Sequence, residues 1–401
     1  MKNRWRLIWP VWVFALLPLA AAWFAYPSSH LPPGFGVFPP QFVRHPPAFD
    51  AGIFGLLAVI EVITIAFIVF PRGFGFKQVA PGPSPTMTRL PAWFWAGAAT
   101  MLFFWWLMWS GTRAFGDLVY YAFTPLWWGL ILTLDGLVYG LSGGRSLLAS
   151  RPKTLLASAV FSVVGWYAFE YLDYFMLSSW YYPNDNLPAL SHAKTVAVFL
   201  VAYSTVWPSI FEWYALLSLF PRLTARYANG PRLRIPAAAL IGGGAALLIG
   251  MVFWPNQLFW AAWLGPFVIA GVLMRHGIWT PFTAMQQGDW RPFVLIALAS
   301  LCDGFFWELW NYGSTHFHAQ ATNPNYWIYV IPYVNRGHLF SEMPLLGYAG
   351  YLPFGVVVWV TFIWAGEVLG FDHEIAISPG ASRDEGQEGA DRYTPSRPVR
   401  S

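Results

Sequence analysis

Long apolar stretches alternate with short polar connections along the whole chain, and this pattern predicts about ten helices that cross a membrane. An α-helix needs about 20 apolar residues to cross the hydrocarbon core of a bilayer. We expect spans near residues 7–26, 50–70, 92–110, 118–141, 154–178, 195–220, 236–254, 257–274, 292–312 and 343–368. The predicted fold class is all-α: a polytopic integral membrane helix bundle formed by residues 1–370.

The connections between these spans fall into different classes. Three longer, aromatic connections, residues 27–49, 179–194 and 313–341, are expected to fold onto the outer surface. Residues 71–90 are rich in proline and are expected to be a linker. Residues 371–401 are polar and poor in apolar side chains, which predicts a disordered tail.

Lys and Arg are concentrated in every second connection. All but four of the 23 basic residues lie in the first segment, in alternate connections or in the tail. The exceptions are Arg44, Arg113, Lys194 and Arg336. Because loops rich in Lys and Arg stay in the cytoplasm, this pattern predicts an inner (plasma) membrane protein with both termini cytoplasmic.

The first apolar stretch has a second interpretation. Lys2, Arg4 and Arg6 precede an apolar run, and residues 20–22 are alanines, as in a cleavable signal peptide. The run is long and contains two prolines, which favours an uncleaved first helix. Cleavage would leave nine spans and would change nothing downstream.

Composition supports a membrane protein and argues against several other classes. The chain has 401 residues, of which 57% are hydrophobic and 10% are charged, whereas soluble domains carry about 25% charged residues. The net charge of +4 is spread over the predicted cytoplasmic loops, so membrane lipid rather than nucleic acid is the expected partner. One cysteine, Cys302, excludes intrachain disulfides and thiolate metal clusters. Many of the 25 Trp lie near span ends, where they anchor helices at the membrane interface.

Several acidic residues lie inside the predicted spans without a basic neighbour in those spans. They are Glu61, Asp135, Glu170, Asp173, Glu212, Asp303, Glu308 and Glu342. Ionisable groups at membrane depth are candidates for function by default. The alternative is that each is a neutral acid that holds helices together by hydrogen bonds.

The outer ends of two predicted spans share a pattern. Glu170 and Asp173 are three residues apart on one helix face, and Glu308 and Asn311 repeat that spacing. Each pair is followed by a Trp-x-Tyr sequence and a returning span that carries another Glu, Glu212 or Glu342. This pattern predicts a parallel hairpin repeat. We expect Glu170, Asp173, Glu308, Asn311 and Glu342 to converge in one outer-leaflet cavity as the candidate catalytic residues.

A metal site is a second hypothesis for the outer face. All but two of the eight His lie there, and His316-x-His318 could chelate Zn, Mn or Fe together with carboxylates. The chain lacks a phosphate-binding Gly-x-x-x-x-Gly-Lys loop, so a nucleotide cofactor is not indicated, and the sequence leaves any other cofactor unknown. Gly242, Gly243 and Gly244 lie within an apolar span and indicate close helix packing.

Two stretches carry resemblances. Residues 123–148 and 341–355, with FFWELWNY before the latter, resemble an uncharacterised family of bacterial multi-pass membrane proteins. The chain is also similar to the repeated membrane units of carotenoid lycopene cyclases, in which an aromatic Trp-x-Tyr-like stretch precedes a proline and paired glutamates.

The matching positions for this second resemblance are Trp180 and Tyr182 with Pro208 and Glu212, and Trp327 and Tyr329 with Glu342. Both units lack the paired glutamate, and Pro344 follows Glu342 instead of preceding it. The resemblance implies acid catalysis on an isoprenoid, and these departures fall on the acids that would perform it.

Three functions remain open from the sequence. The first is a membrane-embedded enzyme that acts on an isoprenoid or another lipid, a hydrophobic small-molecule substrate, through its outer carboxylates. The second is a structural or quinone-contacting subunit of a membrane complex, with a protein partner. The third is a proton- or cation-coupled transporter. No pair of helices broken by Gly or Pro is expected, which argues against the third.

Overall fold

The computed structural model describes residues 4–377, and nearly all of the regular structure in this range is helical. The longer helices are α1 (Trp9–Ala25), α2 (Ala51–Val69), α3 (Ala92–Ser110), α4 (Phe123–Leu141), α6 (Pro152–Phe175), α7 (His192–Tyr203), α8 (Val206–Ser218), α10 (Ala237–Phe253), α12 (Phe267–Arg275), α14 (Arg291–His316) and α15 (Tyr351–Leu369). The short helices are α5 (Leu147–Ser150), α9 (Pro221–Thr224), α11 (Ala261–Leu264) and α13 (Pro281–Gln286). Four 3-10 turns, η1 (Arg4–Leu7), η2 (Pro71–Phe74), η3 (Gly116–Tyr121) and η4 (Leu345–Gly350), complete the helical elements.

Each of the ten apolar segments predicted from the sequence contains at least one helix, so the all-α fold class is confirmed. Five segments in the described part of the chain are long and apolar enough to cross a membrane. They are Ala51–Val69, Pro152–Phe175, His192–Ser218, Arg291–His316 and Leu345–Leu369. The crossing of a membrane by all ten segments stays a prediction.

Two of the ten segments are interrupted, which the sequence analysis did not expect. Segment 257–274 divides into α11 and α12 at Gly265 and Pro266, and segment 195–220 divides into α7 and α8 at Ser204 and Thr205. Only the first break lies at Gly and Pro, so the described residues contain one such segment and not the pair that the sequence analysis also did not expect. Because an unwound turn exposes backbone groups, each break needs polar partners inside the bundle.

The break between α7 and α8 is held by a hydroxyl from another helix. The Ser162 hydroxyl on α6 donates to the Tyr203 carbonyl and accepts from the Trp207 amide at 3.1 Å. In an uninterrupted helix that amide would bond the Tyr203 carbonyl directly. Pro208 has no amide hydrogen and cannot donate to the Ser204 carbonyl, so this turn lacks a second backbone hydrogen bond as well. A side chain inserted into the helical ladder is a common cause of such a break.

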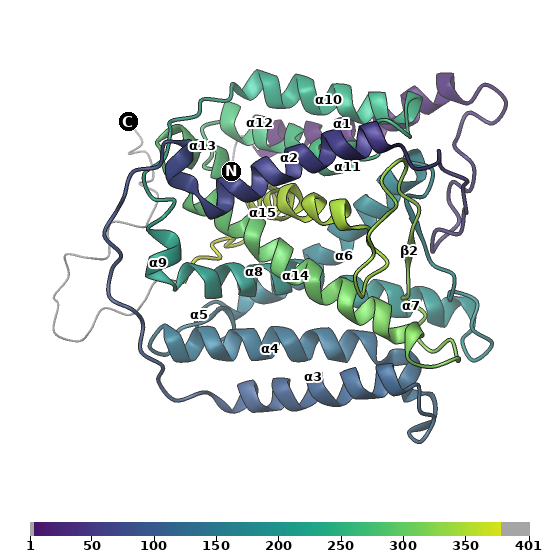
Figure 1. Ribbon diagram of the computed structural model, residues 1–401, viewed down its shortest axis with the longest axis horizontal. Helices are drawn as coiled ribbons and strands as arrows, with labels where there is room; N and C mark the ends of the chain where they lie inside the picture. Colours follow the sequence, from purple (N-terminus) through teal and green to yellow (C-terminus); the bar gives the residue numbers. More distant parts are fainter. Residues whose placement is uncertain (1–3, 378–401) are drawn as a thin grey trace.

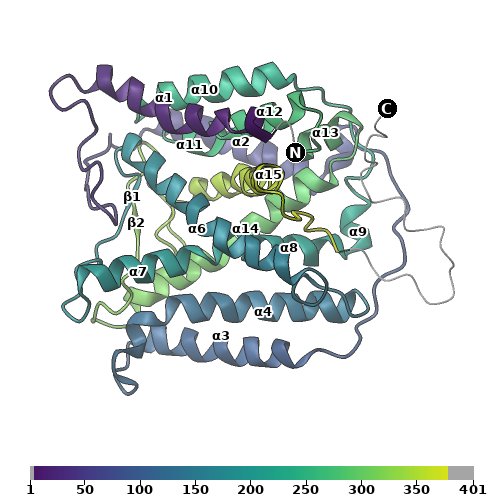
Figure 2. The same cartoon turned by 180° about the vertical axis from the view of Figure 1, so that it is seen from behind.

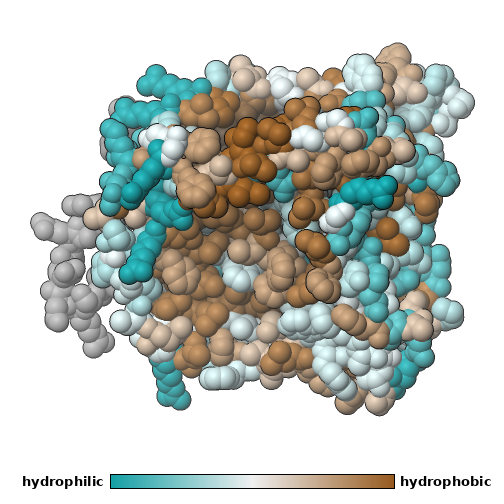
Figure 3. Space-filling model, in the orientation of Figure 1, coloured by the Kyte–Doolittle hydropathy of each residue, from teal (hydrophilic) through white to brown (hydrophobic). Residues whose placement is uncertain are grey.

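The helices lie roughly side by side, and the two ends of the bundle differ (Figures 1 and 2). The short helices α5, α9 and α13 lie at one end, whereas α7 and the two short strands lie towards the other. On the face seen in Figure 3, hydrophobic residues fill most of the middle and hydrophilic residues gather towards the two ends. This distribution is what a lipid-facing surface between two aqueous layers requires.

Small residues allow the closest helix contacts. α3 packs along α4, and a Cβ added at Gly129 would lie 2.5 Å from the Met101 backbone nitrogen. α10 packs along α12, and a Cβ at Gly244 would lie 2.6 Å from the Gly265 carbonyl oxygen. The expected packing role of the glycine triplet thus falls on Gly244, because Gly242 and Gly243 face open space.

The start of the predicted tail is packed instead of free. Arg151 binds the Asp372 carboxylate at 3.0 Å, and Ile375 and Ile377 are buried. The prediction of disorder is therefore wrong for residues 372–377. The remaining part of the predicted tail, residues 378–401, lies outside the described residues.

Candidate functional site

The two hairpins predicted to be repeats meet in a two-stranded antiparallel sheet. Strand β1 (Trp180–Tyr181) follows α6, and strand β2 (Ile328–Tyr329) follows α14. Trp180 is the register partner of Tyr329, and Tyr181 is the partner of Ile328. The first residue of one Trp-x-Tyr sequence therefore faces the last residue of the other.

Glu170 on α6 is fully buried and accepts four hydrogen bonds. The indole of Trp166 donates to Oε1 at 2.9 Å, and the indole of Trp180 donates to Oε2 at 3.1 Å. The hydroxyls of Tyr182 and Tyr203 also donate to Oε1, the latter at 2.8 Å. Three of the four donors bind Oε1 and one binds Oε2, and two of the four are indoles, which can only donate.

Glu308 on α14 is also fully buried, but every side chain that is hydrogen-bonded to it uses a hydroxyl group. The hydroxyls of Tyr329 and Tyr351 donate to Oε1 at 2.8 and 2.6 Å. The Ser341 hydroxyl lies 3.3 Å from Oε2. A hydroxyl can donate or accept, so this set is compatible with either protonation state of Glu308.

Asp173 and Asn311 bind the backbone that begins each strand. Asp173 Oδ1 accepts from the amides of Ser179 at 2.7 Å and Trp180 at 3.4 Å. Asn311 Oδ1 accepts from the Trp327 amide at 3.1 Å, and its Nδ2 donates to the Trp327 carbonyl at 2.8 Å. Each helix thus fixes its own strand with the residue three positions after the glutamate.

The same set of contacts therefore occurs twice. In each hairpin a buried glutamate binds the Tyr of the Trp-x-Tyr sequence and a second Tyr from the returning segment, Tyr203 or Tyr351. The residue three positions later binds the Trp amide in both cases. The sequence analysis identified the glutamate, the residue three positions later and the Trp-x-Tyr sequence in each hairpin, but it missed Tyr203 and Tyr351.

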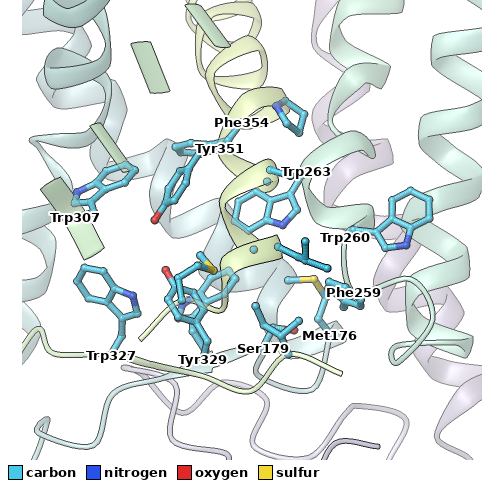
Figure 4. A pocket seen from close by; sticks show the side chains of 18 of the residues that line it. Met176, Ser179, Phe259, Trp260, Trp263, Trp307, Trp327, Tyr329, Tyr351 and Phe354 are labelled. Carbon is cyan, nitrogen blue, oxygen red and sulfur yellow. The ribbon is translucent and has the colours of Figure 1, made fainter. Parts of the chain in front are cut away.

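A cavity of about 380 Å³ lies between the two hairpins (Figure 4). Trp307 and Trp327 stand on one side of it, and Trp260 and Trp263 stand on the other. Its walls include the aromatic donors of both glutamates: Trp166, Trp180, Tyr182, Tyr203, Tyr329 and Tyr351. One face of α2 closes a further side with Leu57, Ile60, Glu61 and Thr64. Cavities of this size and apolar character bind small molecules.

No family model matches the chain, and no curated protein or solved structure is detectably similar to it. Function is therefore inferred from the cavity and its surroundings.

The five predicted catalytic side chains do not themselves line the cavity. Glu170, Asp173, Glu308 and Asn311 lie one layer behind its wall and hold the aromatic residues that form it. Glu342 has other partners, since its Oε1 accepts from the Tyr326 hydroxyl at 2.8 Å and lies 3.5 Å from His316 Nε2. The prediction that all five side chains line one cavity is corrected accordingly: four lie behind its wall, and Glu342 lies with Tyr326 and His316.

His316 and His318 do not form a common site with a third ligand. His316 stacks on Tyr312 and lies beside Glu342, whereas His318 Nε2 lies 3.1 Å from the Met108 carbonyl. Within residues 4–377 no group of three His, Cys, Asp or Glu side chains could hold a metal ion. The described residues thus provide no support for the metal hypothesis.

A basic residue that the sequence analysis did not include in the candidate site lies close to the buried polar residues behind the cavity wall. Arg44, in the connection between α1 and α2, is buried and donates to the Asn256 side chain at 3.2 Å and to the Val330 carbonyl at 3.0 Å. Burial lowers the pKa of Arg44 to about 10, against the opposing attraction of Asp173. The same connection reaches Tyr182, whose amide donates to the Pro40 carbonyl at 3.2 Å. Residues 27–49 therefore contact the chain next to both strands.

Proposed function

We propose that this chain is a bacterial inner-membrane protein with about ten spans and both termini in the cytoplasm, which binds an isoprenoid or another unsaturated lipid and acts on it. The observation that carries the proposal is the aromatic cavity between the two hairpins. Lys and Arg are absent from its lining, while ten of the 31 lining residues are Trp or Tyr. The faces of such rings attract positive charge and pack well against conjugated or branched hydrocarbon.

The two-ended arrangement of the molecule supports the proposed topology. The basic connections that contain α5, α9 and α13 gather at one end of the bundle, and β1 and β2 lie towards the other (Figures 1 and 2). With positive loops retained in the cytoplasm, the cavity and its two strands would face the outer leaflet.

The hydrogen bonds support different roles for the two buried glutamates. Glu170 has two indole donors that cannot accept a proton beside its two tyrosine hydroxyls, so its surroundings favour the negative charge more than those of Glu308 do. Glu308 is bound by hydroxyls that can reverse direction, and Tyr329 and Tyr351 stand between it and the cavity. Glu308 could therefore give a proton to a bound alkene through one of these tyrosines, while the aromatic walls stabilise the cation that forms.

This chemistry agrees with the resemblance to lycopene cyclase units, which also centres on a Trp-x-Tyr sequence. In this chain both such sequences contribute residues to the cavity wall, and the acids behind them come from the preceding helices. A cyclisation or isomerisation that begins with alkene protonation fits the groups present.

The deciding experiment compares lipid extracts from a deletion strain, its parent and two complemented strains. Trp327→Leu removes a cavity wall, and Trp95→Leu removes a Trp that is 63% exposed and distant from the lining. We expect an unsaturated lipid to accumulate in the deletion strain and in Trp327→Leu but not in Trp95→Leu. Identical lipid profiles in the deletion strain and its parent would count against an enzyme and favour a structural subunit.

A further inference from the structure

A second group of buried acids lies at the other end of the bundle. Asp135 on α4 and Glu212 on α8 are both fully buried, and the two carboxyl groups interact directly. α4 and α8 pack against each other. Two carboxylates side by side in a membrane interior would repel strongly, and desolvation would make both charges costly.

The two acids differ in their hydrogen bonds. Asp135 accepts from the Trp93 indole, the Ser146 hydroxyl and the Leu148 amide, each at 2.8 Å. Neither oxygen of Glu212 has a hydrogen-bond donor among the described residues. The donors around Asp135 stabilise a negative charge, whereas nothing around Glu212 does.

The surroundings offer no positive charge to this pair. Within the described residues, no Lys, Arg or His makes an ion pair with Asp135, Glu212 or the third acid nearby, Asp303. Asp303 on α14 has one oxygen 2.8 Å from the Ser209 hydroxyl, and its other oxygen has no partner. Ser209 lies three residues before Glu212, on the same face of α8.

We infer that Asp135 and Glu212 form a proton-binding site, in which Glu212 carries the proton and donates it to the ionised Asp135. This assignment satisfies the otherwise unpaired Glu212 and leaves one negative charge, held by three donors, instead of two. Two of those donors, Ser146 and Leu148, lie where the chain leaves α4 and enters α5, at the end of the bundle opposite the strands. The site is therefore distinct from the aromatic cavity and does not depend on the function proposed for it.

The direction of the pH effect follows from this assignment. A Glu that keeps its proton when folded but loses it near pH ~4.3 when unfolded makes the folded state bind the extra proton. Stability is then greatest below pH ~4.3 and falls as the pH rises from there, until the folded protein has lost the shared proton. Asp303 and Glu308 are also fully buried acids that could add to such a fall, so only the difference between Glu212→Gln and the native protein is assigned to Glu212.

The test uses the full-length protein purified in detergent. Infrared spectra at neutral pH should contain a protonated-carboxyl band that shifts in heavy water, and Glu212→Gln should lose that component. The thermal unfolding temperature of the native protein should fall on alkalinisation, and Glu212→Gln should lose this fall because Gln still donates to Asp135 and has no proton to release. Asp303→Asn and Glu61→Gln, each removing an acid outside the pair, should keep the component assigned to Glu212.

Two outcomes would overturn the inference. An unchanged carboxyl band and an unchanged alkaline fall in Glu212→Gln would mean that Glu212 holds no proton. A rise in unfolding temperature when sodium replaces potassium at equal ionic strength would instead indicate a cation between the two acids. Both the spectrum and the sodium comparison can be made on the native protein alone, so the inference can be tested even if Glu212→Gln does not fold.

Discussion

Trp180 and Tyr329 are register partners in the short sheet, and each binds the buried glutamate of its own hairpin. Trp180 donates to Glu170 at 3.1 Å, and Tyr329 donates to Glu308 at 2.8 Å. One backbone pair therefore joins two carboxylates that lie far apart in sequence, and a change at either glutamate acts on the strand that lines the cavity.

The different donors of the two glutamates predict different costs for the same substitution. Glu170→Gln places an amide N–H against an indole N–H in either orientation, which should cost about 1–3 kcal/mol of unfolding free energy. Glu308→Gln should cost less than about 1 kcal/mol, because the tyrosine hydroxyls can turn to accept from the amide. Denaturation of the purified variants would check this, and equal costs would contradict the assigned roles.

Activity should respond in the opposite order to stability. Glu308→Gln keeps size and hydrogen bonding but has no proton to give, so complementation of the deletion strain should fail while the protein still folds and inserts. Tyr351→Phe tests the same route, since it removes the hydroxyl that contacts Glu308 at 2.6 Å and lines the cavity. Full complementation by Glu308→Gln would show that Glu308 has only a structural role.

Asp173 and Asn311 occupy matching positions but should not be interchangeable. Asn311→Asp removes the donor to the Trp327 carbonyl and brings a carboxylate towards that oxygen, at a cost of about 1–3 kcal/mol. Asp173→Asn keeps the acceptor for the Ser179 amide and should cost less than about 1 kcal/mol. Their unfolding temperatures, measured side by side, provide the comparison, and Asp173→Asn being the more damaging change would argue against the described contacts.

Ser162 should be needed for the break between α7 and α8. Ser162→Ala leaves the Trp207 amide and the Tyr203 carbonyl without their shared partner, and we expect a loss of about 1–3 kcal/mol. Ser158→Ala on the same helix is a control, because that hydroxyl bonds only its own helix at the Leu155 carbonyl. A smaller effect for Ser162 than for Ser158 would mean that the break closes without it.

Reporter fusions can check the topology. A reporter after Gly230 should be active only as a cytoplasmic marker, and one after Asn323 only as an external marker. Gly230 lies between α9 and α10, and Asn323 lies in the connection between α14 and β2. The same location for both sites would contradict the proposed number of spans between them.

The long apolar runs were sufficient to predict where most of the helices lie, but not where two of them are interrupted. Long runs such as 50–70 and 92–110 match α2 and α3 within one or two residues, since a continuous apolar run must form its hydrogen bonds internally. The interruption at Ser204 was missed because its cause, the Ser162 hydroxyl, lies on a different helix. A proline four residues later, Pro208, was the only local signal.

The candidate site was predicted only in part from the sequence. The spacing of Glu170 with Asp173 and of Glu308 with Asn311 identified the polar residues that lie behind the cavity wall, because residues three apart share a helix face. The spacing could not show that Trp and Tyr would stand between these groups and the cavity. Arg44 was counted only as an exception among the basic residues, and its approach to Asp173 depends on how residues 27–49 fold over the strands.

The small sheet also determines when the cavity can be completed during synthesis. β1 follows α6 directly, but its partner β2 follows α14, so the ribosome must make all the helices from α7 to α14 before the strands can pair. Until then Trp180 and Tyr182 stand at an open edge, and the wall formed by Trp307, Trp327 and Tyr351 does not exist. A nascent chain that stops before residue 328 would therefore contain most of its helices and still lack the complete cavity, so the proposed ligand binding should begin only when the last hairpin is in place.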